Sequence, residues 1–226
     1  MTMYDKDGKA LSEQDEIRAK IGNRFGEING VIKTVVKAKN EYRAKLAELA
    51  SDQAASVYTA DYIAALRRQA EADYRALRQS LYPDFVQALE GLYSLLSLSQ
   101  ANLDLSNPAL SNALKMIEIG GANLDYETAQ KINANFAGNQ AALKAIQSLY
   151  KNTGCLDGGI GKMVYSLSDA TSQIANIGNA ALNGDGSINQ LSGVVEKLAG
   201  LEGTQIEIDK DLEGVTEAAR SGAGLP

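Results

Sequence analysis

The sequence has no histidine and no tryptophan, and it contains one cysteine, Cys155, among 226 residues. Without histidine there is no Ser-His-Asp or Cys-His nucleophile pair, no histidine general base and no histidine metal ligand. One cysteine cannot close a disulfide within the chain or supply a cysteine-based zinc site. We therefore expect no catalytic residues, no metal and no cofactor. An enzyme built from carboxylates, lysines and tyrosines stays open as an alternative, although no spacing predicts one.

Aromatic residues are also scarce, at 6% of the chain, whereas 45% of the residues are apolar. A core of Ala, Leu, Ile and Val is typical of helical bundles, so we expect an all-α fold. The net charge of −6 argues against nucleic acid or an anionic membrane as the main partner. The longest apolar stretch, residues 85–99, is interrupted by Glu90 and is too short to span a bilayer. The charged N-terminus does not resemble a Sec signal peptide.

The composition changes near the middle of the chain. Residues 1–105 carry 14 basic and 15 acidic residues with 5 glycines, whereas residues 106–226 carry 8 basic, 13 acidic and 16 glycines. We predict three regions: a long-helix hairpin at 1–105, a compact helical subdomain at 106–165, and a C-terminal helical arm at 166–226 with an acidic, loose tail.

A heptad pattern occupies the first region. Apolar or aromatic residues recur every seven positions, and a second row follows four positions later with Lys39 as its exception. The first row is Ile21, Ile28, Val35, Tyr42 and Leu49. This pattern predicts one helix from about Ser12 to Ala50. Thr59 can cap a second helix, so the simplest arrangement is an antiparallel hairpin that turns at residues 51–58.

Three glycines, Gly22, Gly26 and Gly30, lie four residues apart inside the first predicted helix. Each glycine costs about 0.5–1 kcal/mol relative to alanine in a helix interior. A stripe of small residues lets another backbone approach closely, so we predict a protein contact there. The alternative is a weak or frayed start of the helix.

The middle region predicts three short helices. Asn107, Asp125 and Asn139 are good N-cap residues, and each is followed by apolar residues at helical spacing. Glycines end each segment. Two glycine-rich motifs nearby resemble ligand-binding loops but are incomplete. Residues 183–189 resemble part of a calcium-binding loop and lack its first and last acidic ligands, and residues 158–162 lack the spacing of a phosphate-binding loop. We therefore expect neither motif to bind a ligand.

The clearest heptad pattern lies in the C-terminal region, where a 3-4 alternation of apolar residues extends to Ala219. Its candidate interaction residues are Leu191, Val194, Leu198, Leu201, Ile208, Leu212 and Val215. We expect this row to need a partner, either elsewhere in the chain or in another chain, because glycines weaken it as an isolated helix. From Glu202 onward there are six acids and two bases, so this arm is acidic.

Several stretches resemble a known class of proteins. These are residues 58–63 (Tyr-Thr-Ala-Asp-Tyr-Ile), 113–121 (Ala-Leu-Lys-Met-Ile-Glu-Ile-Gly-Gly), 136–140 (Phe-Ala-Gly-Asn-Gln) and 149–154 (Leu-Tyr-Lys-Asn-Thr-Gly). Over about a third of the chain, the sequence resembles small helical virion-morphogenesis proteins of tailed phages and prophages of Gram-positive bacteria. The resemblance implies a structural or assembly role in the virion or the host cytoplasm.

We therefore expect a non-enzymatic phage structural or assembly protein that acts through helix-mediated contacts with other protein chains, among them copies of itself in a homo-oligomer. The alternative is a phage-encoded inhibitor that binds a host protein through an acidic helical surface. A pore-forming bundle is a more distant alternative, because no continuous apolar hairpin is present.

Overall fold

The computed structural model describes residues 13–184, 187–204 and 206, and within this part of the chain it contains helices and no strand. The all-α prediction is confirmed. The helices are α1 (Glu13–Glu48), α2 (Asp52–Val57), α3 (Ala60–Ser80), α4 (Tyr82–Ala101), α5 (Pro108–Gly120), α6 (Tyr126–Asn135), α7 (Gln140–Thr153), α8 (Leu167–Asn183) and α9 (Ile188–Leu201), with 3-10 turns η1 (Gly121–Asn123) and η2 (Ile160–Lys162).

Local sequence signals set most helix starts. The side chains of Thr59, Asn107, Asp125 and Asn139 each accept a hydrogen bond from a backbone amide in the first turn of the helix that follows. These bonds satisfy donors that a helix start otherwise leaves unpaired. The four caps lie at the positions that the sequence predicted.

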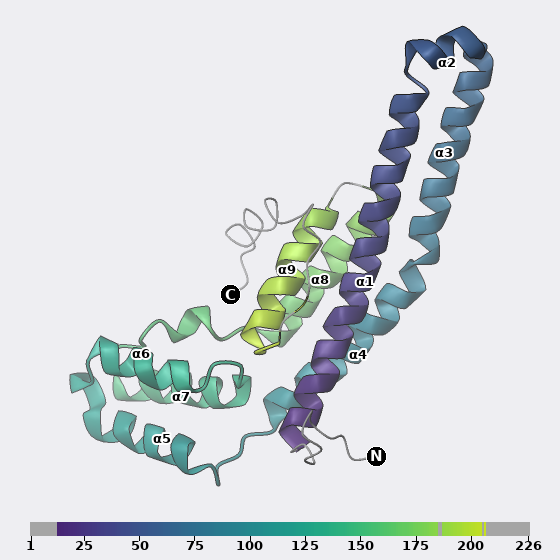
Figure 1. The fold of residues 1–226 in the computed structure, drawn as a ribbon. Helices are drawn as coiled ribbons and strands as arrows, with labels where there is room; N and C mark the ends of the chain where they lie inside the picture. The colour runs from purple at the N-terminus through teal and green to yellow at the C-terminus, as the bar shows by residue number, and fades with distance from the viewer. Residues whose placement is uncertain (1–12, 185–186, 205, 207–226) are drawn as a thin grey trace, which may run out of the picture.

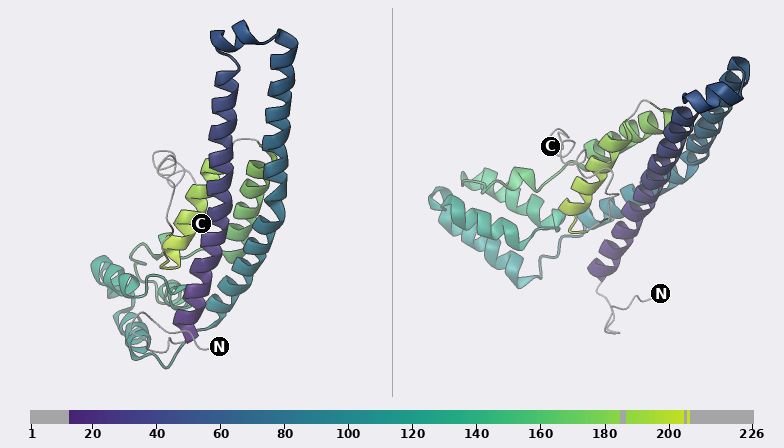
Figure 2. Two further views of the ribbon diagram at one scale, coloured as in Figure 1. Left: turned by 45° about the vertical axis from the view of Figure 1, so that its right-hand side comes forward. Right: turned by 45° about the horizontal axis from the view of Figure 1, so that its top comes forward.

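Helix α1 and helix α3 lie side by side and run antiparallel, with α2 across their ends (Figure 1). Helices α4 and α9 pack along the first half of α1, and α8 packs against α4 and α9, so that the four helices form a bundle (Figure 1). In both other views the α1–α3 hairpin extends past the ends of α8 and α9 (Figure 2). We call its outer part, residues 37–77, the projecting hairpin.

The bundle has a continuous apolar core, to which all four helices contribute. Its fully buried larger side chains are Ile21, Phe25, Ile28, Ile32, Val35, Phe85, Leu92, Leu96, Tyr165, Ile174, Leu191, Val194, Val195 and Leu198. One heptad row of α1 therefore packs against two different surfaces along its length. Ile21, Ile28 and Val35 lie in the bundle core. Further along the same row, Tyr42 packs against Tyr74 of α3.

A second apolar cluster lies outside the bundle and is formed by α5, α6, α7 and η2. Its buried members are Leu110, Ala113, Ile117, Ala129, Ile132, Phe136, Ala142, Leu143, Ile146, Tyr150 and Ile160. We call residues 108–162 the inserted unit, because they lie between the bundle helices α4 and α8 in the chain. The two clusters share no buried residue.

The described part of the predicted C-terminal arm packs against the N-terminal region. Helices α8 and α9 pack into the same core as α1 and α4, so residues 167–201 complete the N-terminal bundle. The physical reason is that the apolar row of α9 finds an apolar partner in its own chain. Within the described residues, no helix is long and apolar enough to cross a membrane.

Candidate functional site

The described members of the predicted C-terminal interaction row are buried inside the chain. Leu191, Val194 and Leu198 are 0–1% exposed, and Leu201 is partly buried against the same core. We had left open whether the two heptad rows pair within or between chains, and in this structure they pack within one chain. These four residues are therefore covered by the chain itself and do not present a surface to a partner.

The apolar spacing of this row extends to Ala219, whereas helix α9 ends at Leu201. Gly203 has a φ of +69°, a left-handed conformation that glycine adopts without strain. The amide of Thr204 then donates to the carbonyl of Ala199 at 2.9 Å, which closes the last turn. Ile208, Leu212 and Val215 lie outside the described residues.

The glycine stripe on α1 makes one close approach. A Cβ at Gly22 would lie 3.7 Å from Cγ2 of Thr204, so the chain after α9 passes over this position. Gly26 and Gly30 are exposed, and a Cβ added at either would meet nothing within 4 Å. Among the residues that the structure describes, then, only the first glycine of the stripe lies against another segment.

The outer end of the projecting hairpin carries exposed apolar and aromatic side chains. Val57, Tyr58 and Tyr62 are 66%, 45% and 51% exposed, and we call them the hairpin-tip patch. The rings of Tyr58 and Tyr62 contact each other, with centroids 5.2 Å apart. The sequence analysis missed this patch. The sequence did contain a signal for it, because these three side chains do not belong to the apolar rows through which the two long helices pack.

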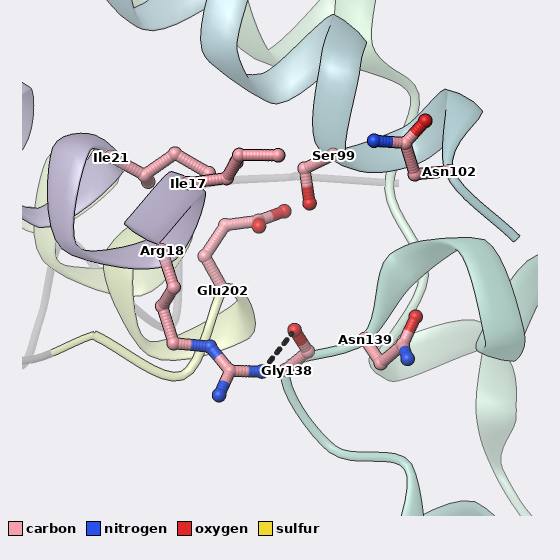
Figure 3. Close-up of a pocket in the computed structure, with 8 residues that line it drawn as sticks. All are labelled: Ile17, Arg18, Ile21, Ser99, Asn102, Gly138, Asn139 and Glu202. Atoms are coloured by element: carbon pink, nitrogen blue, oxygen red, sulfur yellow. Dashed lines mark hydrogen bonds between the residues drawn. The ribbon is translucent and has the colours of Figure 1, made fainter. Parts of the chain in front are cut away.

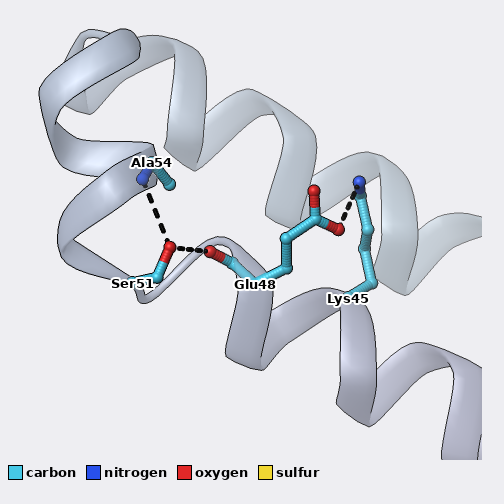
Figure 4. Close-up of polar contacts among 4 residues, drawn as sticks. All are labelled: Lys45, Glu48, Ser51 and Ala54. Carbon is cyan, nitrogen blue, oxygen red and sulfur yellow. Dashed lines mark hydrogen bonds and ion pairs between the residues drawn. The ribbon is translucent and has the colours of Figure 1, made fainter.

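Side-chain hydrogen bonds fix the turn between α1 and α2, next to the hairpin-tip patch. The hydroxyl of Ser51 donates to the carbonyl of Glu48 at 2.7 Å and accepts from the amide of Ala54 at 3.2 Å, which joins the end of α1 to the start of α2 (Figure 4). In the same view Lys45 pairs with Glu48 at 3.0 Å (Figure 4). Across the hairpin, the Arg67 guanidinium donates to the carbonyl of Leu49 at 3.2 Å.

Aromatic and cationic contacts join the two long helices of the hairpin and anchor them to the bundle. Tyr42 of α1 and Tyr74 of α3 stack with centroids 5.1 Å apart and an interplanar angle of 9°. The guanidinium of Arg78 lies 4.5 Å from the centroid of the Tyr74 ring. Arg78 is buried and donates to the carbonyl of Leu182 at the end of α8, at 3.1 Å. The hairpin is thus fixed at its base and free of the bundle at its tip.

A buried polar junction joins the inserted unit to the bundle. Lys144 of α7 donates to the side-chain oxygen of Gln100 of α4 across this contact. On the bundle side, the hydroxyl of Tyr165, which is itself part of the bundle core, donates to the carboxyl of Glu202, which is 2% exposed. The amide of Gln140 donates to the carbonyls of Met163 and Leu201 at 2.8 and 3.2 Å. We call Gln100, Gln140, Lys144, Tyr165 and Glu202 the buried junction.

Burial sets the protonation of this junction. It raises the pKa of the Glu202 carboxyl, while the Tyr165 hydrogen bond, Arg18 and Lys144 act in the opposite direction. Burial also raises the pKa of the Tyr165 hydroxyl and lowers the pKa of Lys144. A carboxyl buried in this way favours its neutral, protonated form.

Beside Glu202 lies a small cavity of about 30 Å³, which Ile17, Arg18, Ser99, Asn102 and Asn139 line with Gly138 and Ile21 (Figure 3). This volume suits a water molecule rather than a substrate. Among the described residues, no group of three or more His, Cys, Asp or Glu is arranged to hold a metal ion.

Two sites thus emerge, the hairpin-tip patch and the buried junction. Comparison of the chain with protein-family models, with curated proteins and with solved structures finds no match, so its role has to be argued from these residues.

Proposed function

We propose that this chain is a non-enzymatic structural or assembly protein of a tailed phage or prophage, and that it binds another virion protein through the hairpin-tip patch. The observation that carries the proposal is the exposed cluster of Val57, Tyr58 and Tyr62 at the outer end of a hairpin that extends past the bundle. Tyrosines at the centre of an interface are frequent sources of binding energy.

Three features of the hairpin support a docking role. Its tip lies away from both apolar cores, so a partner can reach it without displacing the bundle (Figure 1). The Ser51 corner and the Tyr42–Tyr74 stack order it before binding, which reduces the entropy lost in the complex. The class of partner rests on the sequence resemblance to virion-morphogenesis proteins.

C-terminal acids gathered on one exposed face would favour the inhibitor alternative. Of the six acids from Glu202 onward, only Glu202 lies among the described residues, and its carboxyl is buried. No described feature therefore favours an acidic inhibitor surface over the hairpin-tip patch.

The test is to co-express the full chain with each virion protein encoded in the same phage or prophage genome. The mass of each purified complex is measured by light scattering behind a sizing column. We expect one partner to give a complex of combined mass. The double variant Tyr58→Ser/Tyr62→Ser should weaken that complex at least tenfold, because both rings leave the interface.

Tyr82→Ser/Tyr93→Ser is a matched control, since these tyrosines are 44% and 48% exposed but lie on the bundle helix α4. It should bind as the unmodified chain does. The proposal fails if no virion protein forms a complex, or if the tip variant and the control variant bind equally well.

A further inference from the structure

Polar groups join the inserted unit to the bundle. Each has its own apolar cluster, and only two chain connections, residues 102–107 and 163–166, join them. Besides the buried junction, the guanidinium of Arg18 donates to the carbonyl of Gly138 at 3.4 Å. Two units with separate cores and a polar contact can change their relative position without disrupting either core.

Glu202 lies where the bundle meets the inserted unit, because it lines the small cavity together with Arg18 of α1 and with Gly138 and Asn139 of the inserted unit. It follows α9, and its carboxyl reaches Tyr165, which lies just before α8. The backbone beside it is tightly packed against the inserted unit, since a Cβ at Gly138 would lie 3.1 Å from the Cα of Gly203. Any movement of the inserted unit away from the bundle therefore exposes Glu202 to water.

Few charges compensate this carboxyl. The charged and titratable groups facing it are Arg18 from α1, Lys144 from α7 and the Tyr165 hydroxyl, while α4 contributes the neutral Ser99 and Asn102. Arg18 bonds to Gly138 and Lys144 to Gln100. Within the described chain, no ion pair at 4.0 Å or less is formed by Glu202.

We propose that Glu202 is a proton-controlled latch between the bundle and the inserted unit. The latch holds the unit in place while the carboxyl is protonated, and it releases the unit when the carboxyl ionises. A carboxylate buried without a close cation is unfavourable, whereas the same carboxylate is well hydrated once the junction opens. The proposal is independent of the hairpin-tip patch, which lies at the other end of the molecule.

The sign of the pH dependence follows from the protonation of the two forms. Burial raises the pKa of Glu202 in the closed form, and in the open form the pKa falls to its ordinary value of about 4.3. Between these two pKa values opening releases one proton. The ratio of open to closed molecules therefore rises by up to tenfold per pH unit and then levels off above the closed-form pKa.

The test measures the distance between two fluorophores on the full chain, one at Ser172→Cys on α8 and one at Ala134→Cys on α6, in a Cys155→Ser background. Both labelled positions are exposed. Single-molecule energy transfer is recorded from pH 4.5 to 9. We expect a population with a changed distance that grows with pH in the otherwise unmodified chain.

Glu202→Gln is neutral at every pH and should abolish the pH dependence, leaving the closed population throughout. Glu90→Gln changes an exposed glutamate on α4 and should leave the pH dependence as it was. A flat response of the unmodified chain, a response of opposite sign, or an unchanged response of Glu202→Gln would each overturn the latch. Circular dichroism checks that helix content is constant.

A second variant keeps the test decisive if Glu202→Gln does not fold. Tyr165→Phe removes a hydrogen bond that holds down the pKa of Glu202. The levelling-off of the open-to-closed ratio should then move to higher pH. If it stays at the same pH, the carboxyl of Glu202 does not control the junction.

Discussion

Replacing Leu198 with alanine tests whether the C-terminal heptad row packs within the chain. Leu198 is 0% exposed in the bundle core, so Leu198→Ala removes buried methyl groups and leaves a cavity. A substitution of this kind costs about 2–5 kcal/mol of unfolding free energy. For a chain of this size, a loss of about 3 kcal/mol lowers Tm by roughly 6–12 °C.

The assay is thermal unfolding followed by circular dichroism at two protein concentrations, with the mass of each sample measured by light scattering. Leu105→Ala is the matched control because Leu105 is 65% exposed between α4 and α5. We expect the control to change stability by no more than about 0.5 kcal/mol.

Packing within one chain predicts a lower Tm for Leu198→Ala at both concentrations and an unchanged mass. Packing between chains predicts instead a smaller mass and a Tm that depends on concentration. An equal Tm for Leu198→Ala and Leu105→Ala would refute the burial argument altogether.

Two further perturbations follow from local geometry. Gly178→Ala places a Cβ 2.0 Å from Cζ of the buried Phe85, so it should lower the free energy of unfolding by about 1–3 kcal/mol, measured by urea unfolding. Gly30→Ala lies at an exposed helix position with open space around it and should raise the free energy of unfolding by about 0.5–1 kcal/mol. Equal effects of the two substitutions would contradict this reasoning. Burial raises the pKa of Tyr150 to about 12, so an absorbance titration should show this tyrosine ionising near that pH. Because its unfolded pKa is near 10, the inserted unit should lose stability as pH rises from about 10 to 12, and Tyr150→Phe should remove that loss.

Much of the secondary structure could be predicted because the signals are local. A cap such as Asn107 or Asp125 needs only the backbone amides two or three residues ahead, so its role can be read from the sequence. The heptad row of α1 likewise follows from spacing alone. The break after α9 was harder to predict, since the apolar spacing continues past Gly203 and only the backbone conformation there ends the helix.

The candidate sites could not be predicted in the same way. Glu202 appeared in the sequence as the first acid of an acidic arm, and its burial depends on Tyr165 and Gln140, which lie far from it in the chain. The hairpin-tip patch depends on where the bundle ends relative to the hairpin. Neither relation has a signature in residue spacing.

The helical character of the chain, the capped starts of its helices, the turn between α1 and α3 and the apolar faces all follow from the order of the residues alone. These properties depend on contacts within a few residues or on the period of a helix. Other properties depend on how distant segments pack: α9 covers α1 of the same chain, a carboxyl is buried between two cores, and one valine and two tyrosines stay exposed at the hairpin tip. An apolar helix face is stable only when another apolar surface covers it. Which surface covers it depends on how all the helices of the chain are placed relative to one another.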